Sequence, residues 1–224
     1  MENKIVIPTG YMGSGSSAVT DLLSEVAGYS CSNGNFEYVF MHCPNGVFDL
    51  EDKLLKGNNA LRSDEALHTF YSCMKTLYTN KYYWVADYKD KVGPDFMSWC
   101  VEFISSLMDE RTKDVYWYYQ ENPNAKIYIE KTLTKIIKLI SFGKVVPKPG
   151  LRYEEMWLSY TTPSEFYSRA RILLDKFFLQ MGISNSNIIL DQFVLPHNLY
   201  RIENYFEDNC KVIVVDRDPR DVFL

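Results

Sequence analysis

The stretch KIVIPTGYMGSGSS, residues 4–17, joins a short apolar run to a loop rich in glycine and serine. The run from Lys4 to Ile7 has the composition of a buried strand. After the loop, apolar residues recur at the three-and-four spacing of an amphipathic helix; they are Ala18, Val19, Leu22, Leu23 and Val26. The stretch therefore predicts a strand over 4–7, a loop, and a helix over about residues 15–27.

The loop has the composition of an oxyanion site. A helix N-terminus offers unpaired N–H groups and the positive end of the helix dipole, and glycine lets the backbone approach an oxyanion closely. The candidate binding residues are Gly13, Ser14, Gly15, Ser16 and Ser17. We expect them to hold a phosphate or sulfate group, with a plain glycine-rich turn as the alternative.

Residues 10–17 also fit the P-loop pattern GxxxxGK[ST] at every defined position except one. Ser16 stands where that pattern has lysine. The lysine of a P-loop reaches the β- and γ-phosphates of a bound nucleotide, so its replacement disfavours ATP or GTP hydrolysis.

The rest of the chain alternates predicted helices and strands. Helical periodicity predicts helices over 64–79, 96–108 and 163–181, and a further helix marked by Leu199, Ile202 and Phe206. Thr162 and Glu165 form a capping box in front of the third of these helices. Apolar runs predict strands over 127–131, 187–191 and 211–216. This order predicts an α/β fold, a single domain over 1–224 with a central, mainly parallel sheet and right-handed crossovers.

Composition excludes several classes of protein. The 224 residues are 46% apolar, with a net charge of -5, which argues against a protein that coats nucleic acid. The five cysteines show no CxxC spacing and the three histidines are scattered, so we expect neither a disulfide framework nor a metal site, and cysteines that are reduced and mostly buried. No signal peptide precedes the first strand, and no apolar stretch reaches the ~20 residues that span a bilayer. We therefore expect a cytoplasmic protein without a transmembrane segment.

A second informative stretch, CKVIVVDRDPRDVFL, covers residues 210–224. It places Arg217 and Arg220 just after a predicted strand. The carboxyl ends of parallel strands are where α/β folds bind their ligands, so these arginines are candidates for binding an anion. Helix capping or a surface ion pair is the alternative.

The GSGSS loop followed by RDPRDV resembles the sulfotransferases that use 3′-phosphoadenosine 5′-phosphosulfate (PAPS), in particular bacterial sulfotransferase-like proteins. The resemblance implies a three-layer, P-loop NTPase-like α/β fold. It also implies that the first loop holds the 5′-phosphosulfate and that Arg217 binds the 3′-phosphate. A second 3′-phosphate ligand of the family, a serine eight positions later, would follow Leu224, so the resemblance implies that the family's C-terminal part is missing from these residues.

Two further stretches resemble the family. FEYVFMHCPNGVFDLEDKL, residues 36–54, is similar to a segment in which a glutamate precedes an aromatic residue and a Pro-x-Gly-x-x-Asp-Leu turn. This likeness implies that Glu37 lies near the acceptor. In ILDQFVLPHN, residues 189–198, Asp191 and Gln192 replace the Lys-Thr-Pro that many members carry at this place.

The departures from the family concern the catalytic groups. Relatives carry Lys or Arg just before the Ser-Gly of the first loop, where this chain has Gly13. Lys131, at the end of the predicted strand 127–131, is our candidate for the missing cation, with a solvated lysine as the alternative. Glu37 is the candidate general base, and His42 and Asp191 are its rivals.

The resemblance implies transfer of a sulfuryl group from PAPS to a hydroxyl or amine, most plausibly on a carbohydrate, with adenosine 3′,5′-bisphosphate as the second product and no metal. Aromatic clusters such as residues 82–84, YYW, are candidates for stacking on sugar rings, although core packing explains them more simply. Two alternatives are a P-loop kinase-like phosphotransferase, which Ser16 opposes, and a non-catalytic nucleotide-binding protein, which Gly13 supports.

Overall fold

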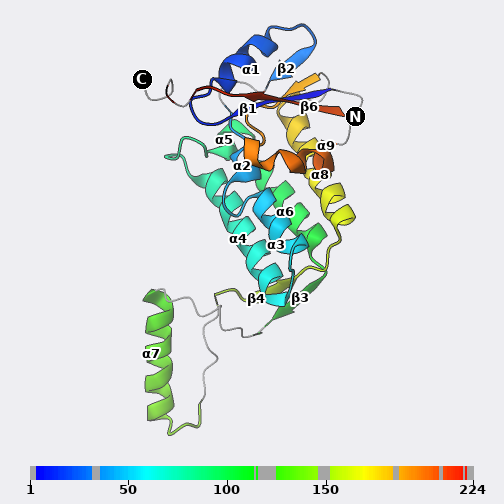
Figure 1. Cartoon of the computed structure of the whole chain (residues 1–224). Coiled ribbons are helices and arrows are strands. Elements are labelled where there is room, and N and C mark those ends of the chain that lie inside the picture. Colours follow the sequence, from blue (N-terminus) through cyan, green and yellow to red (C-terminus); the bar gives the residue numbers. More distant parts are fainter. Residues whose placement is uncertain are drawn as a thin grey trace.

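Four parallel strands form the central sheet of this α/β protein, in the order β2-β5-β1-β6 (Figure 1). The computed structural model describes residues 4–31, 36–113, 115, 125–145, 152–183, 187–206, 209–218 and 220. The strands of this sheet are β1 (Ile5–Gly10), β2 (Tyr29–Cys31), β5 (Asn187–Ile189) and β6 (Cys210–Val215). The predicted parallel sheet is confirmed in these residues.

Strand β1 lies between β5 and β6 and is paired with both. Ile5 is opposite Ile188 on one side, and the pairing with β6 continues along the whole strand to Gly10, opposite Val215. Every residue of β1 is buried, as expected for a central parallel strand. The loop that follows β1 therefore starts from the best-supported strand of the sheet.

The helices cover both sides of the sheet. Helix α1 (Ser16–Ser24) packs on one face, and α9 (Ile202–Phe206) and α8 (Pro163–Gln180) lie on the other, followed by the remaining helices of the body (Figure 1). These are α2 (Val39–His42), α3 (Val47–Leu55), α4 (Ala60–Thr79), α5 (Tyr88–Lys91) and α6 (Phe96–Leu107), with the 3-10 helix η2 (Pro196–Arg201) leading into α9.

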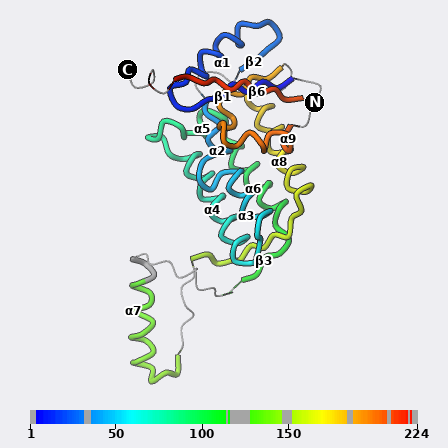
Figure 2. The backbone as a smooth tube through the Cα atoms, in the orientation of Figure 1, coloured from blue at the N-terminus to red at the C-terminus, as the bar shows by residue number. Residues whose placement is uncertain are grey.

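The end of the helical body remote from the sheet carries two elements that the sequence analysis did not predict in this form. Strands β3 (Glu110–Lys113) and β4 (Glu155–Leu158) pair antiparallel, and helix α7 (Ala125–Ile140) stands apart from the body beyond them (Figures 1 and 2). None of the helices among the described residues is both long and apolar enough to cross a bilayer.

An aromatic cluster joins the two layers. The ring of Phe177 on α8 stacks on Phe40 with centroids 5.0 Å apart, and it lies 5.6 Å from Phe36 and 5.9 Å from Tyr38. All four side chains are buried. Such contacts add to the burial of apolar area, so the segment 36–42 is held firmly against α8.

Most of the predicted helices are confirmed. Helices α4 and α6 occupy the predicted ranges to within a few residues, and Thr162 caps α8 with the complete capping box to Glu165. The helix predicted around Leu199 is the combination of η2 and α9.

The strand predicted over 127–131 is wrong, because these residues belong to α7. Ile129 starts an apolar stripe that continues with Leu133, Ile136 and Ile140, and a helix presents such a period on one face. A five-residue apolar run is too short to tell helix from strand when it is considered alone.

Two expectations about burial are corrected, and one strand is less buried than its apolar sequence suggests. Strand β6 is an edge strand of the described sheet, and its residues Ile213 and Val214 are exposed. The loop 82–84 does not pack into the core, since its three aromatic side chains are exposed. All five cysteines are free thiols, but only Cys100 is fully buried.

A buried ion network ties α3 to η2. The guanidinium of Arg201 lies 2.8 Å from a carboxylate oxygen of Glu51 and 2.6 Å from one of Asp52. Arg201 and Glu51 are only 4% and 3% exposed. Glu51 also accepts hydrogen bonds from the hydroxyls of Tyr167 and Tyr205, at 3.0 and 2.9 Å. Each buried charge therefore has the partners that its removal from water requires.

This network yields a stability prediction. Changing Arg201 to Met leaves the Glu51 carboxylate buried without its counter-charge, which should lower the free energy of unfolding by about 3–5 kcal/mol. The measurement is urea unfolding at neutral pH. Changing Lys56, an exposed partner of Asp52 at 2.8 Å, to Met is the matched control and should leave the midpoint nearly unchanged. Equal midpoints for the two variants would show that the buried pair contributes nothing.

Candidate functional site

Three segments leave the central sheet at the same edge, the carboxyl ends of its strands. They are the loop 10–17 after β1, the segment 190–195 after β5 and residues 216–218 after β6. Strand β1 is the point where connections diverge, because α1 leads to β2 on one side and η2 with α9 leads from β5 to β6 on the other. Open α/β sheets bind ligands at such a point.

The loop 10–17 folds back over the end of β1. Gly13 and Gly15 have φ angles of 81° and 94°, which only glycine adopts without strain. Gly10 is needed for another reason, since a Cβ atom there would lie 2.1 Å from Ser14 Oγ and 2.7 Å from the Val215 carbonyl oxygen. These glycines therefore allow the backbone conformation and the close packing that the loop requires.

The backbone of this loop presents free donors. Gly15 is the N-cap of α1 and no side chain caps this helix. Among the described residues, the N–H groups of Gly15, Ser16 and Ser17 donate to no protein acceptor. Free N–H groups at the start of a helix can bind an oxyanion, so the loop remains a candidate oxyanion site.

The three serines of the loop differ in their surroundings. The Ser14 hydroxyl is buried without a hydrogen-bond partner in the described structure. Ser16 Oγ accepts a hydrogen bond from the side-chain amide of Gln192 at 3.1 Å, and Ser17 Oγ donates to Asp191 at 3.3 Å. Two of the three hydroxyls thus bind the segment after β5, and the hydroxyl of Ser14 is buried with no partner among the described residues.

Glu37 lies at the same edge, close enough to Asp191 for the two carboxyls to interact electrostatically. The carboxyl of Glu37 is half-buried; its burial and the negative charge of Asp191 raise its pKa, while Lys91 lowers it. Burial likewise raises the pKa of Asp191, partly offset by the hydroxyls of Thr20 and Ser17. A carboxylate whose pKa is raised is a better proton acceptor, so this pair is the group in the site best suited to act as a base.

Lys91 is a residue that sequence reasoning missed. It lies on α5, where its ammonium group donates to the Trp84 carbonyl oxygen at 2.6 Å and its charge acts on Glu37. Lys131, the predicted cation, is on α7, and the structure does not bring it to the loop (Figure 1). No motif marks Lys91, because only tertiary packing places α5 next to residue 37.

A pocket of about 280 Å³ lies at the other end of the segment that carries Glu37. Two chain segments run side by side there: Glu37 lies near Asp191, Tyr38 contacts Phe193 with ring centroids 5.5 Å apart, and His42 lies near His197. The pocket is lined by His42, Cys43, Pro44, Phe48, Asp49, Asp52, His197, Asn198 and Arg201. Burial and the nearby His197 lower the pKa of His42, so its imidazole is neutral at pH 7.

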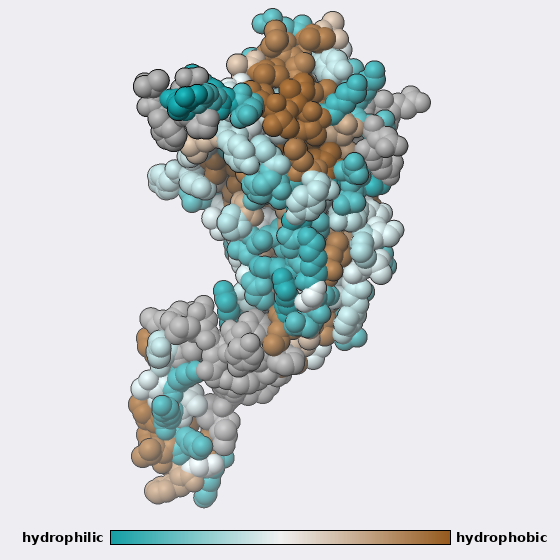
Figure 3. All heavy atoms as spheres, in the orientation of Figure 1, coloured by the Kyte–Doolittle hydropathy of each residue, from teal (hydrophilic) through white to brown (hydrophobic). Residues whose placement is uncertain are grey.

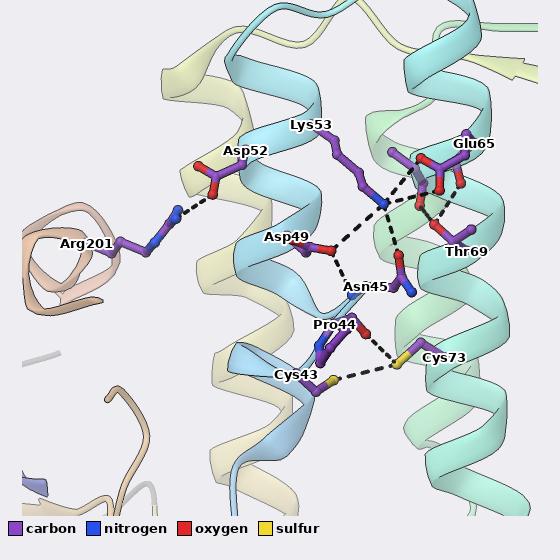
Figure 4. A network of polar contacts seen from close by, with 11 residues as sticks. Cys43, Pro44, Asn45, Asp49, Asp52, Lys53, Glu65, Thr69, Cys73 and Arg201 are labelled. Atoms are coloured by element: carbon purple, nitrogen blue, oxygen red, sulfur yellow. Dashed lines mark hydrogen bonds and ion pairs between the residues drawn. The ribbon is translucent and has the colours of Figure 1, made fainter. Parts of the chain in front are cut away.

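The wall of this pocket is held in place by polar contacts with α4 (Figure 4). Lys53 bridges the Asn45 side-chain oxygen, at 2.9 Å, and the Glu65 carboxylate, at 3.2 Å. The backbone N–H of Asn45 donates to Asp49 at 2.9 Å, and the sulfur atoms of Cys43 and Cys73 lie 3.6 Å apart. The pocket wall is therefore rigid on the side that faces α4.

The two arginines of the RDPRD motif differ in their partners. Arg220 forms an ion pair with Asp218, with nitrogen and oxygen 2.5 Å apart. Arg217 is exposed and forms no ion pair with any described residue. It follows β6, whose last residue is paired with Gly10 at the start of the loop. Among the described residues, Arg217 is thus the arginine of the motif whose charge is not paired, which makes it the better candidate to bind an anion.

The described residues contain no group of three His, Cys, Asp or Glu side chains placed to hold a metal ion. Searches against protein-family models, curated proteins and solved structures gave no match to this chain. The functional argument therefore depends on the residues and their geometry.

The proximity of Glu37 and Asp191 can be measured. Changing Asp191 to Asn removes the like charge, so the pKa of Glu37 should fall, while the contribution of burial keeps it above the ordinary value. Carbon-13 NMR of the Glu37 carboxyl in a pH titration measures this shift. Asp95, an exposed residue at the start of α6, gives the control variant Asp95→Asn, which should leave the Glu37 titration unchanged. An identical titration in both variants would show that the two carboxyls are not neighbours.

Proposed function

We propose that this protein transfers a sulfuryl group from PAPS to a hydroxyl or amine of an acceptor, as a sulfotransferase of the P-loop type. The observation that carries the proposal is the loop 10–17 at the end of a central parallel strand, where three N–H groups and the hydroxyl of Ser14 have no partner among the described residues. The strand order around β1 supports a P-loop type of sheet.

The residues at this edge fit the two charged ends of the cofactor. The N–H groups of Gly15, Ser16 and Ser17 would hold the 5′-phosphosulfate, as helix N-termini hold anions. Arg217, exposed and without an ion-pair partner among the described residues, would bind the 3′-phosphate. Gly13 leaves the loop without a cation at this position, and Lys91 is a candidate to replace it, because its charge already acts on Glu37.

When bound, PAPS supplies the sulfuryl group, which forms a bond to the acceptor oxygen or nitrogen as its bond to the 5′-phosphate breaks. Glu37 accepts the proton that the acceptor loses, which its raised pKa favours. The loop amides bind the oxygens of the leaving phosphate, on which negative charge develops. His42, neutral at pH 7 and in the adjoining pocket, is the alternative base.

Two features support a carbohydrate as acceptor. The pocket at His42 mixes histidine, carboxylate and amide side chains, which can hydrogen-bond to hydroxyl groups. The aromatic side chains of Tyr82, Tyr83 and Trp84 are exposed, and the Trp84 carbonyl is bound by Lys91. Exposed aromatic rings with polar edges are suited to stack on sugars.

The contact between Ser17 and Asp191 favours a second candidate, a P-loop phosphotransferase. P-loop enzymes hold Mg²⁺ with the serine or threonine that ends the loop and with an aspartate at the end of a neighbouring strand. Ser17 and Asp191 have this arrangement. Ser16 stands in place of the lysine that binds the phosphates in P-loop enzymes, which opposes this candidate. Its hydroxyl carries no charge and accepts a hydrogen bond from Gln192.

Ligand binding separates the two candidates. Adenosine 3′,5′-bisphosphate should protect the protein from thermal unfolding, and ATP with magnesium should not. Changing Arg217 to Ala should weaken binding of the bisphosphate roughly ten- to a hundredfold and leave 5′-AMP unaffected, because one charge-assisted hydrogen-bonding group is lost. Arg220→Ala is the matched control and should behave as the unchanged protein. Protection by ATP with magnesium alone would overturn the proposal in favour of the phosphotransferase.

Catalysis separates an enzyme from a protein that only binds the nucleotide. Glu37→Gln should abolish transfer from labelled PAPS to a panel of glycans and keep the affinity for adenosine 3′,5′-bisphosphate, because it removes the base and leaves the loop intact. Absence of transfer in the unchanged protein, with tight bisphosphate binding, would identify a binding protein. Full activity in the Gln variant would assign the base to another residue, and His42→Gln is then the variant to test.

A further inference from the structure

Helix α7 exposes an apolar stripe that no described element covers. Six apolar side chains fall within an arc of about 160° on a helix with 3.6 residues per turn; they are Ile129, Leu133, Ile136, Ile137, Leu139 and Ile140, each between 44% and 80% exposed. The helix stands apart from the body of the protein (Figures 1 and 3). Exposed apolar surface of this extent marks an interaction site.

The opposite side of α7 is basic. The segment 128–145 has four lysines and one glutamate, although the whole chain has a net charge of -5. Lys131, Lys135 and Lys138 fall within about 60° of the helix circumference, and Figure 3 shows hydrophilic residues along the side of α7 away from its apolar residues. The charge on this helix therefore selects an anionic partner.

We propose that α7 lies in the surface of a membrane that contains anionic lipids. A helix with a broad apolar face and lysines on its polar face buries the apolar face at the boundary between headgroups and acyl chains. The lysines remain in the headgroup layer, where their long aliphatic stems let the ammonium groups reach lipid phosphates. This placement accounts for the stripe and the charge together.

Two other binding partners for α7 fit the observations less well. Pairing of α7 with the same helix of a second copy would cover the apolar stripe, but it would bring no anionic partner to the lysines on the opposite side of each helix. A nucleic acid would satisfy the lysines, but it has no apolar phase for residues such as Ile136 and Ile140. The proposal does not depend on the activity of the sheet edge.

Vesicle binding tests this placement with the full chain. The protein should sediment with vesicles of phosphatidylcholine mixed with phosphatidylserine, and much less with phosphatidylcholine alone, and the binding should weaken as salt is added. Changing both Lys135 and Lys138 to Gln should reduce the affinity roughly 25-fold, about fivefold for each lysine. Glutamine has a helix propensity close to that of lysine, so this variant keeps the helix. Lys75→Gln with Lys89→Gln, both exposed on the body, is the matched control and should bind as the unchanged protein.

A second variant tests the apolar stripe. Ile136→Asp with Ile140→Asp should abolish vesicle binding and leave the thermal midpoint of the protein unchanged, because α7 makes no extensive contact with another described element. Equal binding to neutral and anionic vesicles would overturn the proposal. The proposal would also be overturned if the unchanged protein bound no vesicles but self-associated in sedimentation equilibrium, and if this variant did not self-associate. That result would assign the apolar stripe to contact with a second copy.

Discussion

The parallel pairing of β1 with β5 and β6 is the constraint on which the site depends. It brings together three segments that are far apart in the sequence, because the carboxyl ends of neighbouring parallel strands meet at one edge. The segment after β5 is bound directly to β1 by two hydrogen bonds. The N–H of Gln192 donates to the Pro8 carbonyl oxygen at 3.0 Å, and the hydroxyl of Thr9 donates to the Val194 carbonyl oxygen at 2.5 Å. A change of register by one residue would move Asp191 away from Ser17.

The aromatic core supplies the second constraint. Residue 37 lies in a segment without regular structure, and its position is set by the buried neighbours Phe36 and Tyr38, which pack on Phe177. The hydroxyl of Tyr88 donates to the Glu37 carbonyl oxygen at 3.0 Å. Packing therefore holds the backbone of Glu37, whose carboxyl interacts electrostatically with Asp191. The same segment therefore contributes apolar side chains to the core and a carboxyl to the candidate site.

The sequence predicts what depends on local pattern and misses what depends on tertiary contacts. The strand and loop at 4–17 were predictable because apolar runs and glycine spacing are local signals, and so was the capping box at Thr162. Predicting that residues 127–131 are helical would have required a sequence window longer than five residues. The exposure of Trp84 and the role of Lys91 had no local signal, since an aromatic run has the same composition in a core and in a loop. The placement of Arg217 followed from its position after a strand, but the lack of an ion pair with any described residue did not.

The two carboxyls at the sheet edge set a condition on any ligand of the loop. An oxyanion held by the N–H groups of α1 adds a negative charge next to Asp191 and Glu37, whose pKa values are already raised, and so favours their protonated forms further. Lys91 offsets part of this repulsion from the side of Glu37. A divalent cation at Ser17 would have the opposite effect and would hold Asp191 ionised. The two candidate reactions therefore act in opposite directions on the pKa of Asp191, because a bound oxyanion alone raises it and a magnesium ion at Ser17 lowers it.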